Sequence, residues 1–194
     1  MRLKYLLILL LVFCFCEAFG QTYSSVISDK EIVGFVKQLS HDTIAKGLYK
    51  IDREIWEWDE EQFASSDNNL GIDKVIARVD SCKKYLSKND LEFMKLQSES
   101  QLTKTWNSAD FEGYLLISEQ GKDEIYTKSR SGKRTIKNNY FSAFSLPLFN
   151  KEKNIAILRY DWSAGFMFAN QCTCLLKLNN GKWKIIKKWD QFSE

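Results

Sequence analysis

The spacing of the apolar residues changes near Trp106, from a helical repeat before it to a two-residue repeat after it. Apolar residues three and four apart share one face of a helix, whereas alternate residues share one face of a strand. Helices followed by strands are typical of an α+β domain. We therefore expect about three N-terminal helices packed on one face of a curved antiparallel sheet, in a single domain over residues 21–194.

Two of the expected helices have clear start signals. Ser28 and Glu31 have the spacing of a capping box, and the predicted helix runs from Ser28 to Gly47, a residue suited to end it. A second helix is predicted over 72–86 from its single apolar stripe, and a third begins at Ser87, with Asp90 three residues on. Residues 48–63 fit either a strand or a short helix.

The second half of the chain alternates between apolar and polar residues. Asn180-Gly181 is its strongest turn signal, because a type I′ hairpin needs positive φ at both central residues. Pro147 has no amide hydrogen to donate, so it should lie in an edge strand or at a strand end. The predicted strands span residues 113–119, 123–128, 140–146, 154–162, 171–178 and 182–189.

Alternation also assigns the faces of the last two predicted strands. Cys172 and Cys174 fall on an apolar face with two leucines, Leu176 and Leu178. The same reasoning separates the side chains of residues 182–189. It places Trp183, Ile185 and Trp189 on one side and Lys182, Lys184 and Lys188 on the other.

Residues 1–20 have the pattern of a secretory signal peptide. Arg2 and Lys4 precede eleven apolar residues, Leu6–Cys16, and Ala18 and Gly20 flank a predicted cut before residue 21. Eleven residues are too few to cross a hydrocarbon core of about 30 Å, so no transmembrane helix is expected in the mature chain. We expect an exported protein, located in the periplasm or outside the cell after cleavage.

The charge balance argues against nucleic acid as a partner. Removal of residues 1–20 leaves 26 Lys and Arg against 24 Asp and Glu. A nucleic-acid binder normally has a basic face large enough to release several counterions. The densest basic cluster surrounds Ser131-Gly132 and is interpreted as a solvated hairpin tip; it comprises Lys128, Arg130, Lys133, Arg134 and Lys137.

Three cysteines remain after cleavage, an odd number for an exported protein. Cys82 lies on the apolar stripe of the predicted helix 72–86, which should pack on the face that carries Cys172 and Cys174. The disulfide candidate is therefore Cys82 with Cys172 or Cys174. Three buried, reduced thiols are the alternative.

Two further segments have both a functional and a structural interpretation. Asp52, Glu54, Glu57, Asp59, Glu60 and Glu61 alternate with Trp56 and Trp58, which fits a carboxylate pair for glycoside hydrolysis or a solvated acidic edge. Phe166, Met167 and Phe168 join two predicted strands where polar turn residues are usual. They form a candidate binding loop or a continuation of the core.

No catalytic, cofactor-binding or metal-ligating residue is assigned. His41 is the only histidine, and the helical spacing places it on the solvent side of the first helix. A tetrahedral zinc site needs four ligands at characteristic spacings, which the cysteines and His41 do not provide. The sequence also lacks a nucleophile elbow and a glycine-rich phosphate loop.

The C-terminal third resembles a known group of proteins. Ser145-Leu146-Pro147-Leu148-Phe149, the strand that opens at Asn154 and the Gly181-Lys182-Trp183 hairpin are similar to small exported bacterial proteins of unassigned function. The final hairpin also resembles that of NTF2-like domains. This resemblance implies a cone-shaped α+β fold in which helices pack on a curved sheet. The resemblance covers about the last fifty residues and supplies no functional residue.

These observations favour a non-catalytic ligand-binding or protein-binding domain of the cell envelope. Its expected partner is a small apolar ligand or an envelope protein, and no cofactor is expected. The alternative is an envelope hydrolase that uses carboxylates of the acidic stretch or Asp161.

Overall fold

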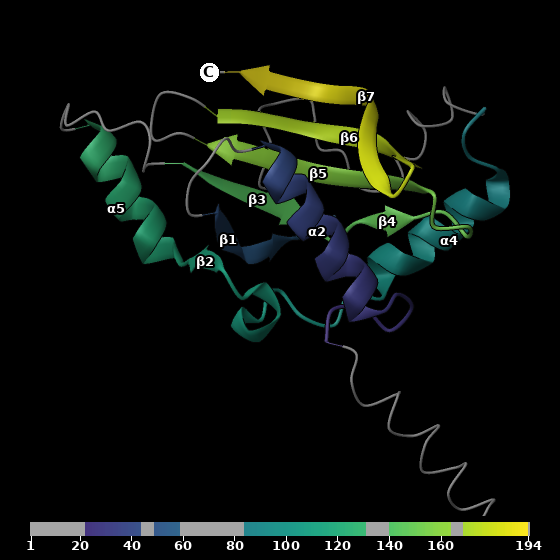
Figure 1. The fold of residues 1–194 in the computed structure, drawn as a ribbon, viewed down its shortest axis with the longest axis horizontal. Helices are drawn as coiled ribbons and strands as arrows, with labels where there is room; N and C mark the ends of the chain where they lie inside the picture. Colours follow the sequence, from purple (N-terminus) through teal and green to yellow (C-terminus); the bar gives the residue numbers. More distant parts are fainter. Residues whose placement is uncertain (1–21, 44–48, 59–83, 131–139, 164–168, 194) are drawn as a thin grey trace, which may run out of the picture.

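The computed structural model describes residues 22–43, 49–58, 84–130, 140–163 and 169–193. These residues form three α-helices and a curved, open sheet of seven strands (Figure 1). The helices are α2 (Asp29–Thr43), α4 (Lys88–Glu99) and α5 (Glu119–Arg130), with a 3-10 helix at Ser108–Phe111. The strands are β1 (Tyr49–Trp56), β2 (Tyr114–Ile117), β3 (Phe141–Ser145), β4 (Leu148–Phe149), β5 (Ile155–Ser163), β6 (Ala169–Asn179) and β7 (Lys182–Ser193).

The sheet is mixed, so the prediction of a fully antiparallel sheet was wrong. Its strand order is β2-β1-β3-β5-β6-β7, and β4 pairs with β5 beside this path. β1 runs parallel to both of its neighbours, β2 and β3, whereas β3, β5, β6 and β7 form antiparallel pairs. Parallel neighbours need long crossover connections, and the chain supplies one between β1 and β2 that contains α4.

The helix starts are confirmed where the structure describes them. The Glu31 carboxylate accepts a hydrogen bond from the Ser28 hydroxyl (2.7 Å) at the start of α2. At α4, Ser87 and Asp90 form a complete capping box. Of the predicted helix over 72–86, residues 72–83 lie outside the described residues, as does Gly47. Residues 84–86 form a turn that leads into α4 and not the end of a helix, so the prediction was wrong for them.

Residues 123–128 belong to helix α5, so the strand predicted there was wrong. Ser118 acts as the helix start, because its hydroxyl accepts a hydrogen bond from the Gly121 amide at 3.3 Å and its carbonyl accepts from the Lys122 amide at 3.0 Å. Gly121 lies inside the helix rather than in a turn. A Cβ at this position would come within 2.9 Å of Ile117, so glycine allows α5 to pack closely on the end of β2.

Both faces of the sheet are covered, which corrects the expectation that the helices share one face. Ala156 and Leu158 of β5 pack in the core that contains α2, whereas Ile155 and Ile157 pack in a second core with Met94 of α4. Successive strand residues point to opposite faces, so α2 and α4 lie on opposite sides of β5. Figure 1 shows α2 crossing one face of the sheet.

A β-bulge in β7 changes which of its side chains share a face. Ile185 pairs with Leu176, but Lys187 pairs with Leu175, so Ile186 is the extra residue. Trp183 therefore packs on the α2 side and Trp189 on the α4 side. The prediction that both tryptophans share one face was wrong for this reason.

Both local backbone signals in this half of the chain are confirmed. Asn180 and Gly181 have φ values of 50° and 75° and connect β6 to β7. Pro147 separates β3 from β4, at the end of a strand. The sequence therefore fixes these two breaks in the sheet through backbone chemistry alone.

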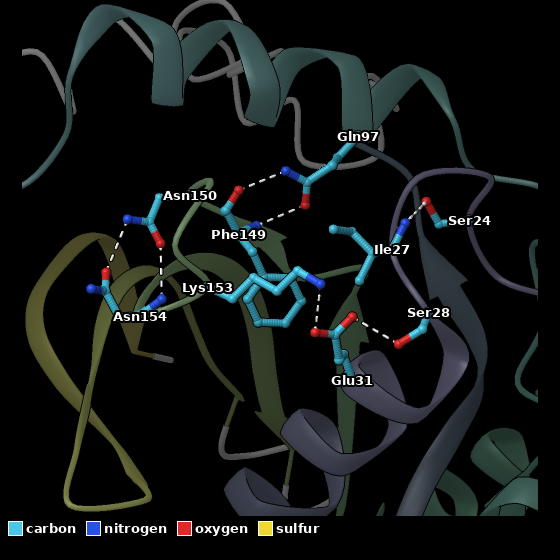
Figure 2. A network of polar contacts seen from close by, with 9 residues as sticks. All are labelled: Ser24, Ile27, Ser28, Glu31, Gln97, Phe149, Asn150, Lys153 and Asn154. Atoms are coloured by element: carbon cyan, nitrogen blue, oxygen red, sulfur yellow. Dashed lines mark hydrogen bonds and ion pairs between the residues drawn. The ribbon is translucent and has the colours of Figure 1, made fainter.

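Gln97 of α4 completes the hydrogen bonding of β4 (Figure 2). β4 pairs with β5 on one side only. On its other side, the Gln97 amide donates to the Phe149 carbonyl at 2.6 Å and accepts from the Phe149 amide at 2.8 Å. A buried side chain therefore takes the place of a neighbouring strand and fixes Phe149 against the core.

The turn after β4 is joined to the start of α2. Lys153, which has a φ of 55°, donates from Nζ to the Glu31 carboxylate at 2.6 Å (Figure 2). Asn150 holds the turn by accepting hydrogen bonds from the amides of Asn154 and Ile155, each at 2.9 Å. The Lys153–Glu31 pair therefore links this turn to the first turn of α2.

Candidate functional site

A cavity of about 320 Å³ lies between the C-terminal half of α2 and the sheet. Leu39 of α2 contributes to one wall, and β3, β5, β6 and β7 contribute the rest. Small-molecule sites are usually clefts of roughly 300–1,000 Å³ with mainly apolar walls and a few polar groups. The walls are formed by Leu39, Phe144, Leu158, Tyr160, Cys174, Leu176, Trp183, Lys184 and Ile185.

Three aromatic rings fix one wall of the cavity. The ring of Trp183 lies 4.9 Å from that of Phe35 and 5.8 Å from that of Phe149, measured between centroids. Phe35 and Phe149 also meet edge to face, at 5.3 Å. Because Gln97 holds the Phe149 backbone, the α4 side of the molecule helps to position the Trp183 wall.

Polar groups lie beside the cavity, next to Tyr160. Tyr160 lines the cavity and lies directly across from Cys172 in the β5–β6 pair. Its hydroxyl oxygen accepts from the Lys188 ammonium at 3.4 Å. Lys188 is opposite Cys174 in the β6–β7 pair, so it shares the face that carries both cysteines.

The two cysteine thiols are buried, with their sulfur atoms 3.4 Å apart. A hydrogen bond from the Cys174 thiol lowers the pKa of Cys172, and hydrogen bonding to Tyr160 and the charge of Lys188 act in the same direction. The pKa of Cys174 is raised by the same contact and by burial. Burial, together with Cys172, raises the pKa of Tyr160.

Of the predicted site residues, the structure brings Cys172 and Cys174 to the cavity region. Cys82 and the candidate loop residues Phe166, Met167 and Phe168 lie outside the described residues. The bridge from Cys82 to Cys172 or Cys174 and the binding loop therefore stay predictions.

Lys188 is a residue of the cavity face that the sequence analysis missed. Simple alternation assigned it to the solvent side with the other lysines, but the bulge at Ile186 moves it to the face of the cavity. The consecutive apolar residues Ile185 and Ile186 are the signal that a strict alternation fails there. Both are exposed, at 40% and 37%.

The acidic stretch is divided rather than assembled into one cleft. Asp52 is buried and its carboxylate accepts from Lys122 of α5 at 2.9 Å. Burial raises the pKa of Asp52, and Lys122 opposes this shift. Glu57 forms an ion pair with Lys104, and residues 59–61 lie outside the described part of the chain. Asp52 does not line the α2 cavity.

The described ranges contain no group of three or more His, Cys, Asp or Glu side chains placed to hold a metal ion. Within these ranges, every helix is too short or too polar to cross a membrane. The side chain of His41, in the last turn of α2, is outside the described residues.

Comparisons of the chain with models of known families, with curated proteins and with solved structures find no match. The geometry of the cavity and of the polar groups beside it is therefore the basis for its function.

Proposed function

We propose that this protein is exported and that its mature domain, residues 21–194, binds a small apolar ligand in the cavity between α2 and the sheet. The observation that carries the proposal is the 320 Å³ cavity, whose walls are mainly Leu, Ile, Phe and Trp side chains. Removing an apolar ligand from water into such walls is favourable by roughly 25 cal/mol for each Å² of apolar surface buried.

The size of the cavity suits a small ligand. Its volume of about 320 Å³ is at the low end of the usual range for small-molecule sites, roughly 300–1,000 Å³. A ten-carbon chain with a small head group is a ligand of this class. Decanol is therefore a suitable neutral probe.

The described carboxylates support binding more than hydrolysis. Asp52 is held by Lys122 away from the cavity walls. Asp161 follows Tyr160 on β5 and so points to the opposite face of the sheet. Neither carboxylate lines the cavity, whereas a glycosidase needs two of them across its cleft.

We also propose that the fold of this domain is related to that of NTF2-like domains. The packing of a helix on a curved sheet, with a cavity between them, supports this relationship. Such shells host many functions, so the ligand is argued from the cavity walls and not from the fold.

Ile185→Asp is expected to weaken decanol binding at least about tenfold, as measured by isothermal titration calorimetry. Ile185 lines the cavity and is 40% exposed, so an aspartate there places a charge at the apolar mouth without opening the core. A tenfold loss corresponds to about 1.4 kcal/mol.

Ile186→Asp is the matched control for this variant. Ile186 is the neighbouring residue, is 37% exposed and is not among the cavity walls. It should bind decanol within about twofold of the unchanged protein. Equal losses in the two variants, or no binding of decanol by the unchanged protein, would reject this cavity as the site.

Export and the disulfide are tested together by the intact mass of the exported protein, alkylated without reductant. We expect a chain that begins at Gln21 and carries one label, because Cys82 is bridged to Cys172 or Cys174. Three labels would contradict the predicted disulfide. A chain that still contains residues 1–20 would contradict the predicted cleavage.

A further inference from the structure

Lys188 places a positive charge next to Tyr160, one of the residues that line the cavity. Its ammonium lies 3.4 Å from the hydroxyl of Tyr160 and 5.9 Å from the centre of the Tyr160 ring. Tyr160 in turn lines the cavity. The Tyr160 side chain therefore contacts both the Lys188 ammonium and the apolar cavity.

Lys188 has hydrogen-bonding capacity left over. An ammonium carries three N–H donors, and the structure gives Lys188 one hydrogen bond, to Tyr160. Among the described residues it forms no ion pair with a carboxylate, unlike Lys104, Lys122 and Lys153. Asp161, the nearest acidic residue in sequence to Tyr160, points to the other face of β5.

We infer that the ligand is an amphipathic anion, whose apolar chain fills the cavity and whose compact head, such as a carboxylate, binds Lys188 beside the Tyr160 hydroxyl. The inference rests on the proposed function and adds the chemistry of the head group. A hydrogen bond to a charged group is stronger than one between neutral groups. Lys188 therefore favours an anionic head over a hydroxyl head on the same chain.

The test compares three ten-carbon probes by titration calorimetry with the mature protein at low ionic strength and pH 6. Decanoate is ionised at this pH, because a carboxyl group has an ordinary pKa of about 4. We expect decanoate to bind at least about tenfold more tightly than decanol, and decylamine to bind more weakly than decanol. Raising the salt concentration to about 0.5 M should reduce the preference for decanoate.

Lys188→Gln is expected to reduce the preference for decanoate over decanol to less than about threefold. Lys188→Arg should keep the preference. The control is Lys187→Gln, which removes the same charge from the next residue. Lys187 pairs with Leu175 and lies over the ring of Trp189, on the opposite face of the sheet.

The outcomes separate the two proposals. Equal binding of decanol and decanoate to the unchanged protein overturns the anionic head group and leaves the apolar site intact. An equal loss of preference in Lys187→Gln and Lys188→Gln also overturns it, because long-range charge then explains the effect. Binding of none of the three probes overturns the inference together with the proposed function.

Discussion

Lys122→Met is expected to lower the free energy of unfolding by about 3 to 5 kcal/mol, as measured by chemical denaturation at pH 7. The substitution leaves Asp52, with 3% of its side chain exposed, without the ammonium that lies 2.9 Å from it. Removing one partner of a buried ion pair costs about this much, because the remaining charge is uncompensated. The pair also joins α5 to β1, so its loss weakens the packing of that helix.

The deficit of this variant should depend on pH in a defined direction. Burial already raises the pKa of Asp52, and Lys122 acts against that rise. Without Lys122 the folded-state pKa of Asp52 rises further above its unfolded value of about 3.9. At low pH the Asp52 carboxyl group is protonated and uncharged, so its burial costs little. The free energy of unfolding then decreases as the pH rises through the folded-state pKa of Asp52. The deficit should be smallest near pH 4 and largest at pH 7.

Two further variants make the prediction specific. Lys88→Met removes an exposed ion pair with Glu92, whose atoms lie 3.7 Å apart, and should change stability by less than about 0.5 kcal/mol. Asp52→Asn combined with Lys122→Met leaves no buried charge at this position and should regain most of the loss. A double variant no more stable than Lys122→Met alone would contradict this explanation.

Gln97→Met is the second large expected effect, a loss of about 2 to 5 kcal/mol in the free energy of unfolding. Methionine keeps the length of the side chain, but neither the amide nor the carbonyl of Phe149 then has a partner on this side of β4. Each buried backbone group left without a hydrogen bond costs about 1–3 kcal/mol. Gln97 is 2% exposed, so water does not replace the lost partner.

Gln101→Met is the control for this prediction. Gln101 is half-buried and donates one hydrogen bond, to the Thr103 carbonyl at 2.9 Å. We expect a loss of about 1 kcal/mol or less from this change. Similar losses in the two variants would show that Gln97 does not serve as the substitute neighbour of β4.

The parts of the fold that follow from local chemistry were predictable. The starts of α2 and α4 depend on side chains three residues apart, Ser28 with Glu31 and Ser87 with Asp90. The β6–β7 turn depends on one Asn-Gly pair, which tolerates positive φ. Each of these signals acts within a few residues, so the sequence displays it directly.

The parts that depend on distant contacts were not predictable. Helix α5 has few apolar residues, so its sequence has no clear helical repeat. The hydrogen bond at Ser118 and the packing of Gly121 on Ile117 are seen only in the folded structure. The parallel pairing of β1 with β2 and β3 joins segments far apart in the chain. Strand β5 has apolar residues on both of its faces because helices pack on both sides of the sheet.

The site was predictable in part. The alternation of β6 correctly placed Cys172, Cys174 and Leu176 on one apolar face. It failed for Lys188, because the bulge residue in β7 reverses the faces of the residues directly after it, up to Trp189. A charged residue that strict alternation assigns to the opposite face therefore lies next to Tyr160, on the face of the cavity.

The crystal structure of residues 21–194 grown with decanoate tests the central claim most directly. The account predicts density for the alkyl chain between Leu39 and Leu158, with the carboxylate within hydrogen-bonding distance of the Lys188 ammonium. An alkyl chain bound elsewhere, with side chains filling the α2 cavity, would contradict it.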